Sequence, residues 1–302
     1  MSSLPRPAKN PPDGYLLLNK KPGITSFDSL GDVKRTFGTG KAGHTGTLDK
    51  FASGLLVVLV GRGAKLAFLF DNFVKEYTGT ITFGTETDTL DPEGAVTAQG
   101  PIPGREALEE ALEHFRGDIL QAPPAYSALH INGRRAHELA REGKEPEMKK
   151  RPVTIHDLEL VSWTPPEAVI RAKVSAGTYI RSLARDIALV AGSRAYLSSL
   201  KRSGVGPFRL EDADGELRPL DVKLFEALSL PCFFLGEREA EAFRHGKPLE
   251  NILPASDAVG GATGGAGSSA VGVFRKDAPD RLLGVLEQKN NKWVYGHVFA
   301  DN

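Results

Sequence analysis

Residues 43–60, GHTGTLDKFASGLLVVLV, join a polar, glycine-rich segment to an unbroken apolar run. The run at 55–60 is rich in β-branched side chains, which predicts a buried strand. The segment before it has neither helical nor strand periodicity, yet it holds His44 and Asp49 among glycines, threonines and a serine. Glycines let a ligand approach the backbone closely, and loops on a rigid scaffold often carry functional groups. Asp49 is therefore a candidate functional residue.

Asp49 on its own is compatible with several roles. A carboxylate can act as a nucleophile, a general base or a metal ligand, and it can equally cap a helix that begins at Phe51. A metal site shared with His44 would need a third ligand, and none lies at a telling spacing. For His44, a hydrogen bond within the loop is the more ordinary interpretation. These residues alone leave the alternatives open.

Outward from this stretch, short strand and helix patterns alternate. Strands are predicted at residues 15–18, 77–83, 153–163 and 168–176, and the second of these alternates apolar side chains with threonines. Helices are predicted over 105–115, over 181–189 before a stop at Gly192, and over 193–204, with a strand after the last. Residues 85–94, TETDTLDPEG, have the composition of turns.

A further helix follows the segment KKPGITS, where Thr25 or Ser26 is the predicted cap. Its apolar side chains, which share one helical face, are Phe27, Leu30, Val33 and Phe37. Strands interspersed with helices, with few βαβ crossovers, favour an α+β fold built on a mixed, mostly antiparallel sheet.

The organisation changes near residues 228–231. After it come one short helical pattern at 237–246 and strand patterns at 272–274, 282–288 and 293–299. Residues 255–270, rich in Gly, Ala and Ser, have almost nothing to bury and are predicted to be a flexible insertion. We therefore expect a disordered tail at 1–14, a large domain at 15–228 and a small β-rich domain at 229–302.

Composition narrows the class of protein. The 302 residues are 40% hydrophobic and 25% charged, as in an ordinary globular protein. Lys plus Arg equals Asp plus Glu at 38 each, so a site for a polyanion would need local clustering of charge. One cysteine, Cys232, excludes an intramolecular disulfide and fits a reducing compartment. With no apolar run of roughly 18 residues and no apolar signal segment, we expect a cytoplasmic protein without membrane contact.

Several ordered motifs carry a family resemblance. GHTGTLD followed by GLL resembles the catalytic signature of the TruB family of tRNA pseudouridine synthases. LNKKPGITS, VKEYTGTITFGTETDTLDPEG and SAGTYIRSLARDIA resemble the family's other motifs, in the same order. YSALHINGRRAHELAREG, KRPVTI and LKRSGVGPF also match, so the similarity covers about residues 15–228. FRHGKPL and the strands after it resemble the small PUA-like RNA-binding domain of these enzymes.

The resemblance implies a pseudouridine synthase fold and the isomerisation of uridine to pseudouridine, typically at position 55 in the T arm of tRNA. It assigns the nucleophile to Asp49, its arginine partner to Arg181 and the residue stacking on the base to Tyr77. Tyr179 and Leu200 match residues that contact the uracil, and His44 matches one that contacts flipped nucleotides. We expect Arg181 to lower the pKa of Asp49. The reaction is redox-neutral, so no cofactor and no metal are expected.

RNA binding would then depend on local charge. Residues 127–151 resemble a mobile insertion that closes over the T arm, and from the family match we expect RNA contacts from Arg134, Arg135 and Arg141. Lys20 and Lys65 resemble further lysines near the RNA. We expect a monomer whose partner is the T stem-loop of tRNA. Two other classes remain open at this point: an RNA-binding protein in which catalysis is secondary, and an N-glycosylase that releases uracil.

The chain departs from the family pattern in a few places. Lys50 stands where a proline usually follows the aspartate, and Lys21-Pro22 shifts the proline of the first motif by one position. His137 stands where a tyrosine is commoner. These departures concern loop geometry and remove no group with an assigned chemical role.

Overall fold

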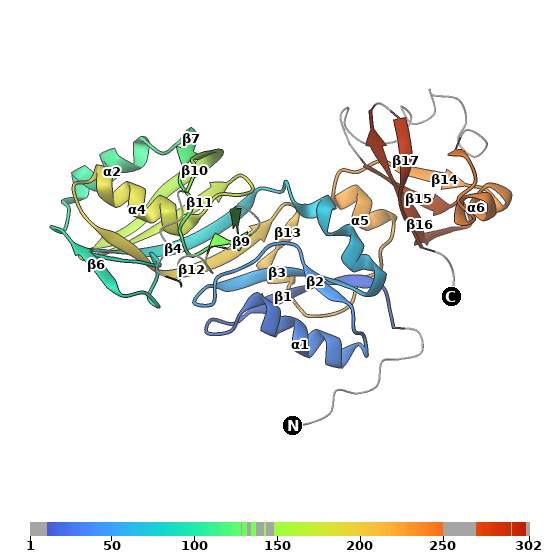
Figure 1. Cartoon of the computed structure of the whole chain (residues 1–302), viewed down its shortest axis with the longest axis horizontal. Helices are drawn as coiled ribbons and strands as arrows, with labels where there is room; N and C mark the ends of the chain where they lie inside the picture. Colours follow the sequence, from blue (N-terminus) through green and yellow to red (C-terminus); the bar gives the residue numbers. More distant parts are fainter. Residues whose placement is uncertain are drawn as a thin grey trace.

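The computed structural model describes residues 11–127, 129–131, 134–136, 142, 148–249, 270–290 and 292–299. Within them, nine strands form one sheet, in the order β1-β3-β12-β4-β11-β10-β7, with β2 beside β3 and β13 beside β12 (Figure 1). Every pairing is antiparallel except that of β12 with β3. The predicted α+β fold with a mixed, mostly antiparallel sheet is thus confirmed.

The strands of this sheet are β1 (Gly14–Lys20), β2 (Ala42–His44), β3 (Ser53–Val60), β4 (Lys75–Phe83), β7 (Gly117–Gln121), β10 (Arg151–Thr164), β11 (Glu167–Val174), β12 (Ala195–Val205) and β13 (Phe208–Arg209). Two short hairpins lie outside it, formed by β5 (Thr85–Thr87) with β6 (Val96–Gln99) and by β8 (His130–Ile131) with β9 (Arg134–Arg135). Most of the predicted insertion at 127–151, including Arg141 and His137, lies outside the described residues.

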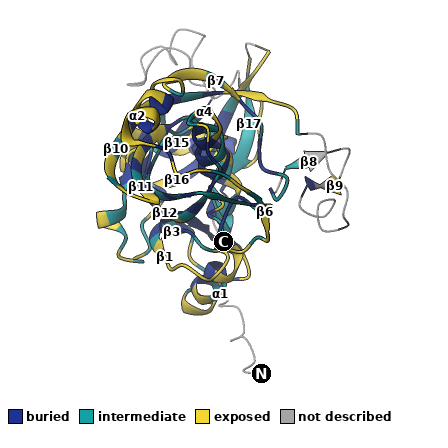
Figure 2. Ribbon diagram, turned by 90° about the vertical axis from the view of Figure 1, so that its left-hand side faces the viewer, coloured by how far each residue is buried: buried dark blue, intermediate teal, exposed yellow. Residues whose placement is uncertain are grey.

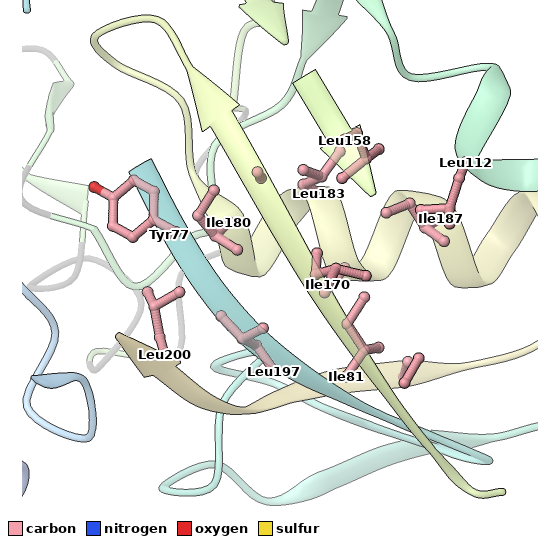
Figure 3. Close-up of a cluster of buried hydrophobic side chains, with 14 of the residues drawn as sticks. Tyr77, Ile81, Leu112, Leu158, Ile170, Ile180, Leu183, Ile187, Leu197 and Leu200 are labelled. Atoms are coloured by element: carbon pink, nitrogen blue, oxygen red, sulfur yellow. The ribbon is translucent and has the colours of Figure 1, made fainter. Parts of the chain in front are cut away.

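Helices α2 (Arg105–Glu113) and α4 (Ile180–Val190) cover one face of the sheet over β4, β10, β11 and β12 (Figure 1). Their apolar side chains form the larger core with those strands, and Figure 3 shows ten of its members labelled. Tyr77 and Leu200 lie at one end of this cluster. Leu48 and Ala52, on either side of Asp49, belong to the same core, and Ser53 Oγ donates to the Leu200 carbonyl at 3.5 Å, which connects the glycine-rich loop to that end.

Helix α1 (Ser26–Thr36) packs on β1 and β3 through Leu30 and Val33, at the edge of the molecule (Figure 2). Thr25 is its N-cap, and a capping box with Asp28 fixes the first turn. Phe27 was predicted to share the buried face, but 70% of it is exposed. At about 100° per residue, Phe27 stands at the margin of the arc that contains Leu30, Val33 and Phe37, so the prediction is wrong for this residue.

The helix predicted over 193–204 is also wrong, because these residues form the long strand β12. The strand pairs with β4 along its length, and the register shifts between Leu197 and Ser199 and again between Arg202 and Gly204. Each irregularity breaks the alternation of period two. Buried Leu197 and Leu200 therefore stand three residues apart, which imitates a helical spacing.

A second sheet contains β14 (Cys232–Leu235), β15 (Ala270–Arg275), β16 (Ala278–Lys289) and β17 (Lys292–Val298), with α6 (Glu237–Arg244) beside it (Figure 1). Strands were predicted in the last three, and β14 was missed. Helix α5 (Val222–Ala227) and the 3-10 helix η1 (Gly61–Phe70) join this part to the large sheet in one apolar cluster that includes Phe70, Phe225 and Phe274. A short 3-10 helix, η2 (Leu210–Asp212), follows β13.

The segment predicted to be a flexible insertion, 255–270, lies outside the described residues except for its last position. Among the described residues, no helix has the length and apolar character needed to span a membrane.

Candidate active site

Asp49 lies in the loop between β2 and β3, where the segment before α1 fixes the backbone. The Leu48 amide donates to Ser26 Oγ at 2.8 Å, and the Ser26 hydroxyl donates to the Leu48 carbonyl at 3.0 Å. The Gly23 amide donates to the Lys50 carbonyl at 2.8 Å. No helix begins at Phe51; the described chain passes through a bend into β3. The capping role considered for Asp49 is therefore excluded.

Arg181, in the first turn of α4, pairs with Asp49. Its Nη2 donates to Asp49 Oδ1 at 2.9 Å and to the carbonyl of Tyr126 at 3.1 Å. The Arg181 side chain is only 5% exposed, whereas that of Asp49 is 34% exposed. The guanidinium thus holds the carboxylate from the protein interior, and the carboxylate stays accessible from outside.

Asp91 is a second carboxylate on the same guanidinium, and sequence reasoning missed it. Arg181 Nη1 donates to Asp91 Oδ2 at 3.1 Å and to the Thr89 carbonyl at 2.8 Å. Asp91 Oδ1 accepts from Thr89 Oγ1 at 2.6 Å and from the Glu93 amide at 3.0 Å. Residues 85–94 were interpreted only as a turn. Asp91 could have been found as a candidate because this turn belongs to a matched motif and contains a carboxylate.

The N-terminus of α4 is positioned by a reciprocal side-chain contact. Gln121, at the end of β7, accepts from the Tyr179 amide at 2.8 Å and donates to the Tyr179 carbonyl at 3.1 Å. Gln121 is buried, so both of its amide groups are used inside the protein. The contact fixes Tyr179 at the N-cap, two residues before Arg181, and so fixes the backbone from which the Arg181 side chain extends.

The electrostatics of Asp49 differ from the expectation. Burial raises the pKa of Asp49 above its ordinary value, the Arg181 guanidinium opposes this, the nearby Asp91 carboxylate reinforces it, and Lys20 opposes it more weakly. We had expected Arg181 to make the pKa fall. The ion pair is present, but desolvation outweighs it because the pair sits in the protein with a second carboxylate on the same guanidinium.

Tyr77 and Leu200 lie on the adjacent strands β4 and β12 and face the same core as Leu48 (Figure 3). Tyr77 is 9% exposed. In Figure 3 its ring stands beside Ile180 and Leu200 at the end of the cluster, and its hydroxyl points away from the other side chains. Gly79 lies opposite Leu200 in the register, so no side chain on β4 occupies that position. The two residues form an apolar wall at the end where Leu200 lies beside Ser53, four residues after Asp49.

His44, at the end of β2, is partly buried, and burial followed by the nearby Arg202 lowers its pKa. It therefore favours the neutral imidazole at neutral pH. Arg202, also missed from the sequence, is only 2% exposed and donates to the Gly46 carbonyl at 3.0 Å and to the Leu55 carbonyl at 2.8 Å. It connects β12 to both ends of the loop that carries Asp49.

Of the predicted RNA-contacting cations, Lys20 does not fit a direct contact. It is 2% exposed, and its ammonium donates to the carbonyls of Lys21 at 3.0 Å and Ile24 at 2.7 Å. Burial lowers its pKa. The group is used to hold the turn before α1, so Lys20 is a positioning residue in this structure. Lys65 is exposed on η1, and nothing in the structure tests its role.

Of the three arginines predicted in the insertion, Arg134 is exposed on β9 and forms an ion pair with Glu142. Arg135 lies on the same strand, and its side chain, like the whole of Arg141, is outside the described residues. Their predicted RNA contacts stay predictions.

Lys50, in place of the usual proline, has a specific partner. Its ammonium lies 2.8 Å from Glu93 Oε1, and both side chains are about half exposed. Glu93 belongs to the turn that carries Asp91. The Lys50–Glu93 pair therefore links the two loops whose carboxylates meet on Arg181.

Among the described residues no group of three or more His, Cys, Asp or Glu is placed to hold a metal ion.

Comparison with known proteins identifies relatives of this chain. Residues 34–180 match the model of the TruB family pseudouridylate synthase N-terminal domain. The tRNA pseudouridine synthase B of Azoarcus sp. (strain BH72) is 40% identical over 290 residues, which cover 90% of this chain and 95% of that protein. The enzyme of that name from Burkholderia mallei is 40% identical over 302 residues, covering 94% and 93%. That from Borreliella burgdorferi (strain ZS7) is 48% identical over 204 residues, covering 67% and 72%.

Solved structures support the fold. A chain of a Cbf5-Nop10-Gar1 complex superimposes with a TM-score of 0.63 at 22% identity, covering 96% of this chain and 84% of that one. A chain of the archaeal box H/ACA sRNP Nop10-Cbf5 complex gives 0.61 at 21% identity, covering 95% and 85%. At such identities the likeness concerns the fold alone. With relatives at 40% identity over nearly its whole length, the chain belongs to the TruB family of pseudouridine synthases.

Proposed function

We propose that this enzyme isomerises the uridine at position 55 in the T arm of tRNA, with Asp49 as the nucleophile. The observation that carries the proposal is the pair of Asp49 and Arg181 at 2.9 Å, next to the apolar wall of Tyr77 and Leu200. The tRNA substrate is suggested by the names of the relatives. The T-arm position and the role of each residue rest on the motif resemblance.

The reaction requires one bond to break and another to form. The bond between C1′ and N1 is cleaved, the base rotates in the pocket, and C5 bonds to C1′. C5 loses its hydrogen as a proton and N1 takes up a proton, so substrate and product are isomers. No electrons are gained or lost overall. Asp49 either attacks the sugar or the base, forming a bond that breaks again before the product leaves, or stabilises the separated fragments. The accessible carboxylate, held from inside by a buried guanidinium, is oriented before the substrate arrives.

The target base must leave the stack of a folded RNA arm to reach Asp49. Extrusion costs a few kcal/mol, which stacking on an aromatic ring offsets at about 1–3 kcal/mol per base. Tyr77 supplies such a ring, and Leu200 and Tyr179 are proposed to contact the uracil. His44, in its neutral form, is proposed to contact nearby nucleotides. Arg134, Arg135, Arg141 and Lys65 are proposed to contact the phosphates.

We further propose that the enzyme acts as a monomer in the cytoplasm, with residues 229–302 as a PUA-like RNA-binding domain and 15–228 as the catalytic domain.

The test of the proposed reaction is to incubate unmodified tRNA transcript with the enzyme and map pseudouridine. Asp49→Asn should abolish product, while Asp71→Asn, an exposed carboxylate after η1, should leave it unchanged. Pseudouridine at another position, release of free uracil, or an active Asp49→Asn would contradict the proposal.

A further inference from the structure

Phe27 is exposed to an unusual degree for an aromatic side chain in the described structure. It is 70% exposed, and Ile24, three residues earlier, is 40% exposed. A single exposed apolar side chain on a protein surface is common and needs no explanation. Here, however, the two residues flank the cap of α1, and their position relative to Asp49 makes them informative.

The backbone under Phe27 is rigid and directly attached to the Asp49 loop. Thr25 and Asp28 form the capping box of α1, with the Asp28 amide donating to Thr25 Oγ1 at 3.0 Å. The residue before Phe27, Ser26, exchanges two hydrogen bonds with Leu48, which precedes Asp49. In Figure 1 the start of α1 lies beside the loop that leads into β3. The backbone that carries Phe27 is thus held against the loop of Asp49.

The charges around the ring favour a polyanion. The Lys34 ammonium lies 5.4 Å from the centre of the Phe27 ring, and Lys21 is exposed on the preceding turn. The two carboxylates of this helix are both engaged: Asp28 in the cap and Asp32 with Arg35. An aromatic ring next to ammonium groups is the combination that proteins use to bind single-stranded nucleic acid, with bases on rings and phosphates on cations.

We propose that Phe27 is a stacking platform for an unpaired nucleobase of the RNA substrate, next to the extruded uridine, with Ile24 extending its apolar edge and Lys34 moving to the adjacent phosphate. This inference rests on the proposed function, because it takes the occupant to be the RNA that reaches Asp49. The occupant is a nucleobase and not a second protein surface, since the apolar area is one ring and its edge and the neighbouring charges are cationic.

The test compares Phe27→Ala, Phe27→Leu and Phe27→Trp with the wild-type enzyme, using a T-arm stem-loop RNA. Stacking contributes about 1–3 kcal/mol per base, which at 1.4 kcal/mol per tenfold corresponds to a loss of about 5- to 140-fold in RNA affinity for the alanine and leucine variants. The tryptophan variant should retain affinity, and its added emission should be quenched by RNA relative to the background of Trp163 and Trp293. Leu189→Ala is the matched control, because Leu189 is 45% exposed in the last turn of α4.

Affinity of the leucine and alanine variants within twofold of wild type would overturn the inference, as would an equal loss in Leu189→Ala. Self-association that Phe27→Ala removes, with RNA affinity unchanged, would also overturn it and would assign the ring to a second copy. Because Phe27 is exposed, folding of the variants is not at risk and is checked by thermal melting. Failure of the proposed function appears separately, as a wild-type enzyme that binds the stem-loop and forms no pseudouridine.

Discussion

Replacing Arg181 with lysine tests the centre of the site, because lysine keeps the positive charge but lacks the two separate nitrogens with which the guanidinium binds two carboxylates. The guanidinium makes four hydrogen bonds, two to the carboxylates of Asp49 and Asp91 and two to backbone carbonyls. A single ammonium cannot span both carboxylates, so at least one loses its partner in a region where Arg181 is 5% exposed.

Removing one partner from a buried ion pair costs about 3–5 kcal/mol. Since lysine retains the charge, we take the lower end, about 3 kcal/mol, which is a fall of roughly 6–12 °C in melting temperature at about 2–4 °C per kcal/mol. Misplacement of a catalytic group by about 1 Å costs about 100-fold in rate, and we expect a loss of kcat of that order in Arg181→Lys.

The pH dependence of kcat/KM provides a second, independent test of the contact between Arg181 and Asp49. The Arg181 guanidinium lowers the pKa of Asp49 against the effect of burial. Weakening that contact should raise the pKa of Asp49 further, and the acidic limb of kcat/KM should move to higher pH. Asp91 raises the pKa of Asp49, so Asp91→Asn should move the same limb to lower pH.

The measurements are thermal melting and single-turnover rates from pH 5 to 9 with a stem-loop RNA. Arg185→Lys is the control, because Arg185 lies one turn further along α4, is 21% exposed and pairs with its neighbour Asp186. It should stay within about 1 kcal/mol of the wild type, because a partly exposed ion pair contributes about 0.2–1 kcal/mol. A stable and fully active Arg181→Lys, or shifts of the same sign in the Arg181 and Asp91 variants, would refute the reasoning.

Three further predictions concern the same loops. Asp49→Asn should raise the melting temperature at neutral pH. A carboxyl whose pKa is raised in the folded protein stabilises that protein below the ordinary pKa of about 3.9, and this contribution is lost as the pH rises; the gain from asparagine should therefore vanish in melts at acidic pH. Lys50→Ala and Glu93→Gln should each lower kcat by at most about fivefold, since an exposed pair contributes about 0.2–1 kcal/mol, and the double variant should be no worse; additive losses would exclude the pair as the cause. Gly54→Ala should cost more than about 3 kcal/mol in urea unfolding, because Gly54 has φ +105 and a Cβ would lie 2.3 Å from a backbone oxygen of β12, whereas Gly177, at φ +81 with open space, should cost about 1–2 kcal/mol.

The sequence predicted the elements with clear periodicity, and it failed where local geometry departs from an ideal period. The alternation of β4 and the stop of α4 near Gly192 were read correctly, because those elements are regular. β12 was mistaken for a helix because its register shifts place buried leucines three residues apart. Phe27 fitted a helical face in the sequence, but a periodicity cannot show where the surface covered by that face ends.

For the site, the motifs indicated which residues belong together, and the structure provides their distances. The contact of Asp49 with Arg181 was expected from the resemblance. The second carboxylate, Asp91, was not expected, because the composition of its segment is typical of a turn. The burial of Lys20 also escaped prediction, because a lysine in a loop is ordinarily exposed. The sign of the pKa shift of Asp49 depends on the balance of burial against pairing, and that balance is set by the three-dimensional packing around the carboxylate.

The most direct test of the account is tritium release from tRNA transcript labelled at C5 of uridine, since forming the bond between C5 and C1′ expels that hydrogen once per turnover. The wild-type enzyme should release tritium in proportion to the pseudouridine mapped at position 55 of the T arm, and Asp49→Asn should bind the same RNA and release none. Turnover by Asp49→Asn, or release of free uracil with tritium retained, would contradict it.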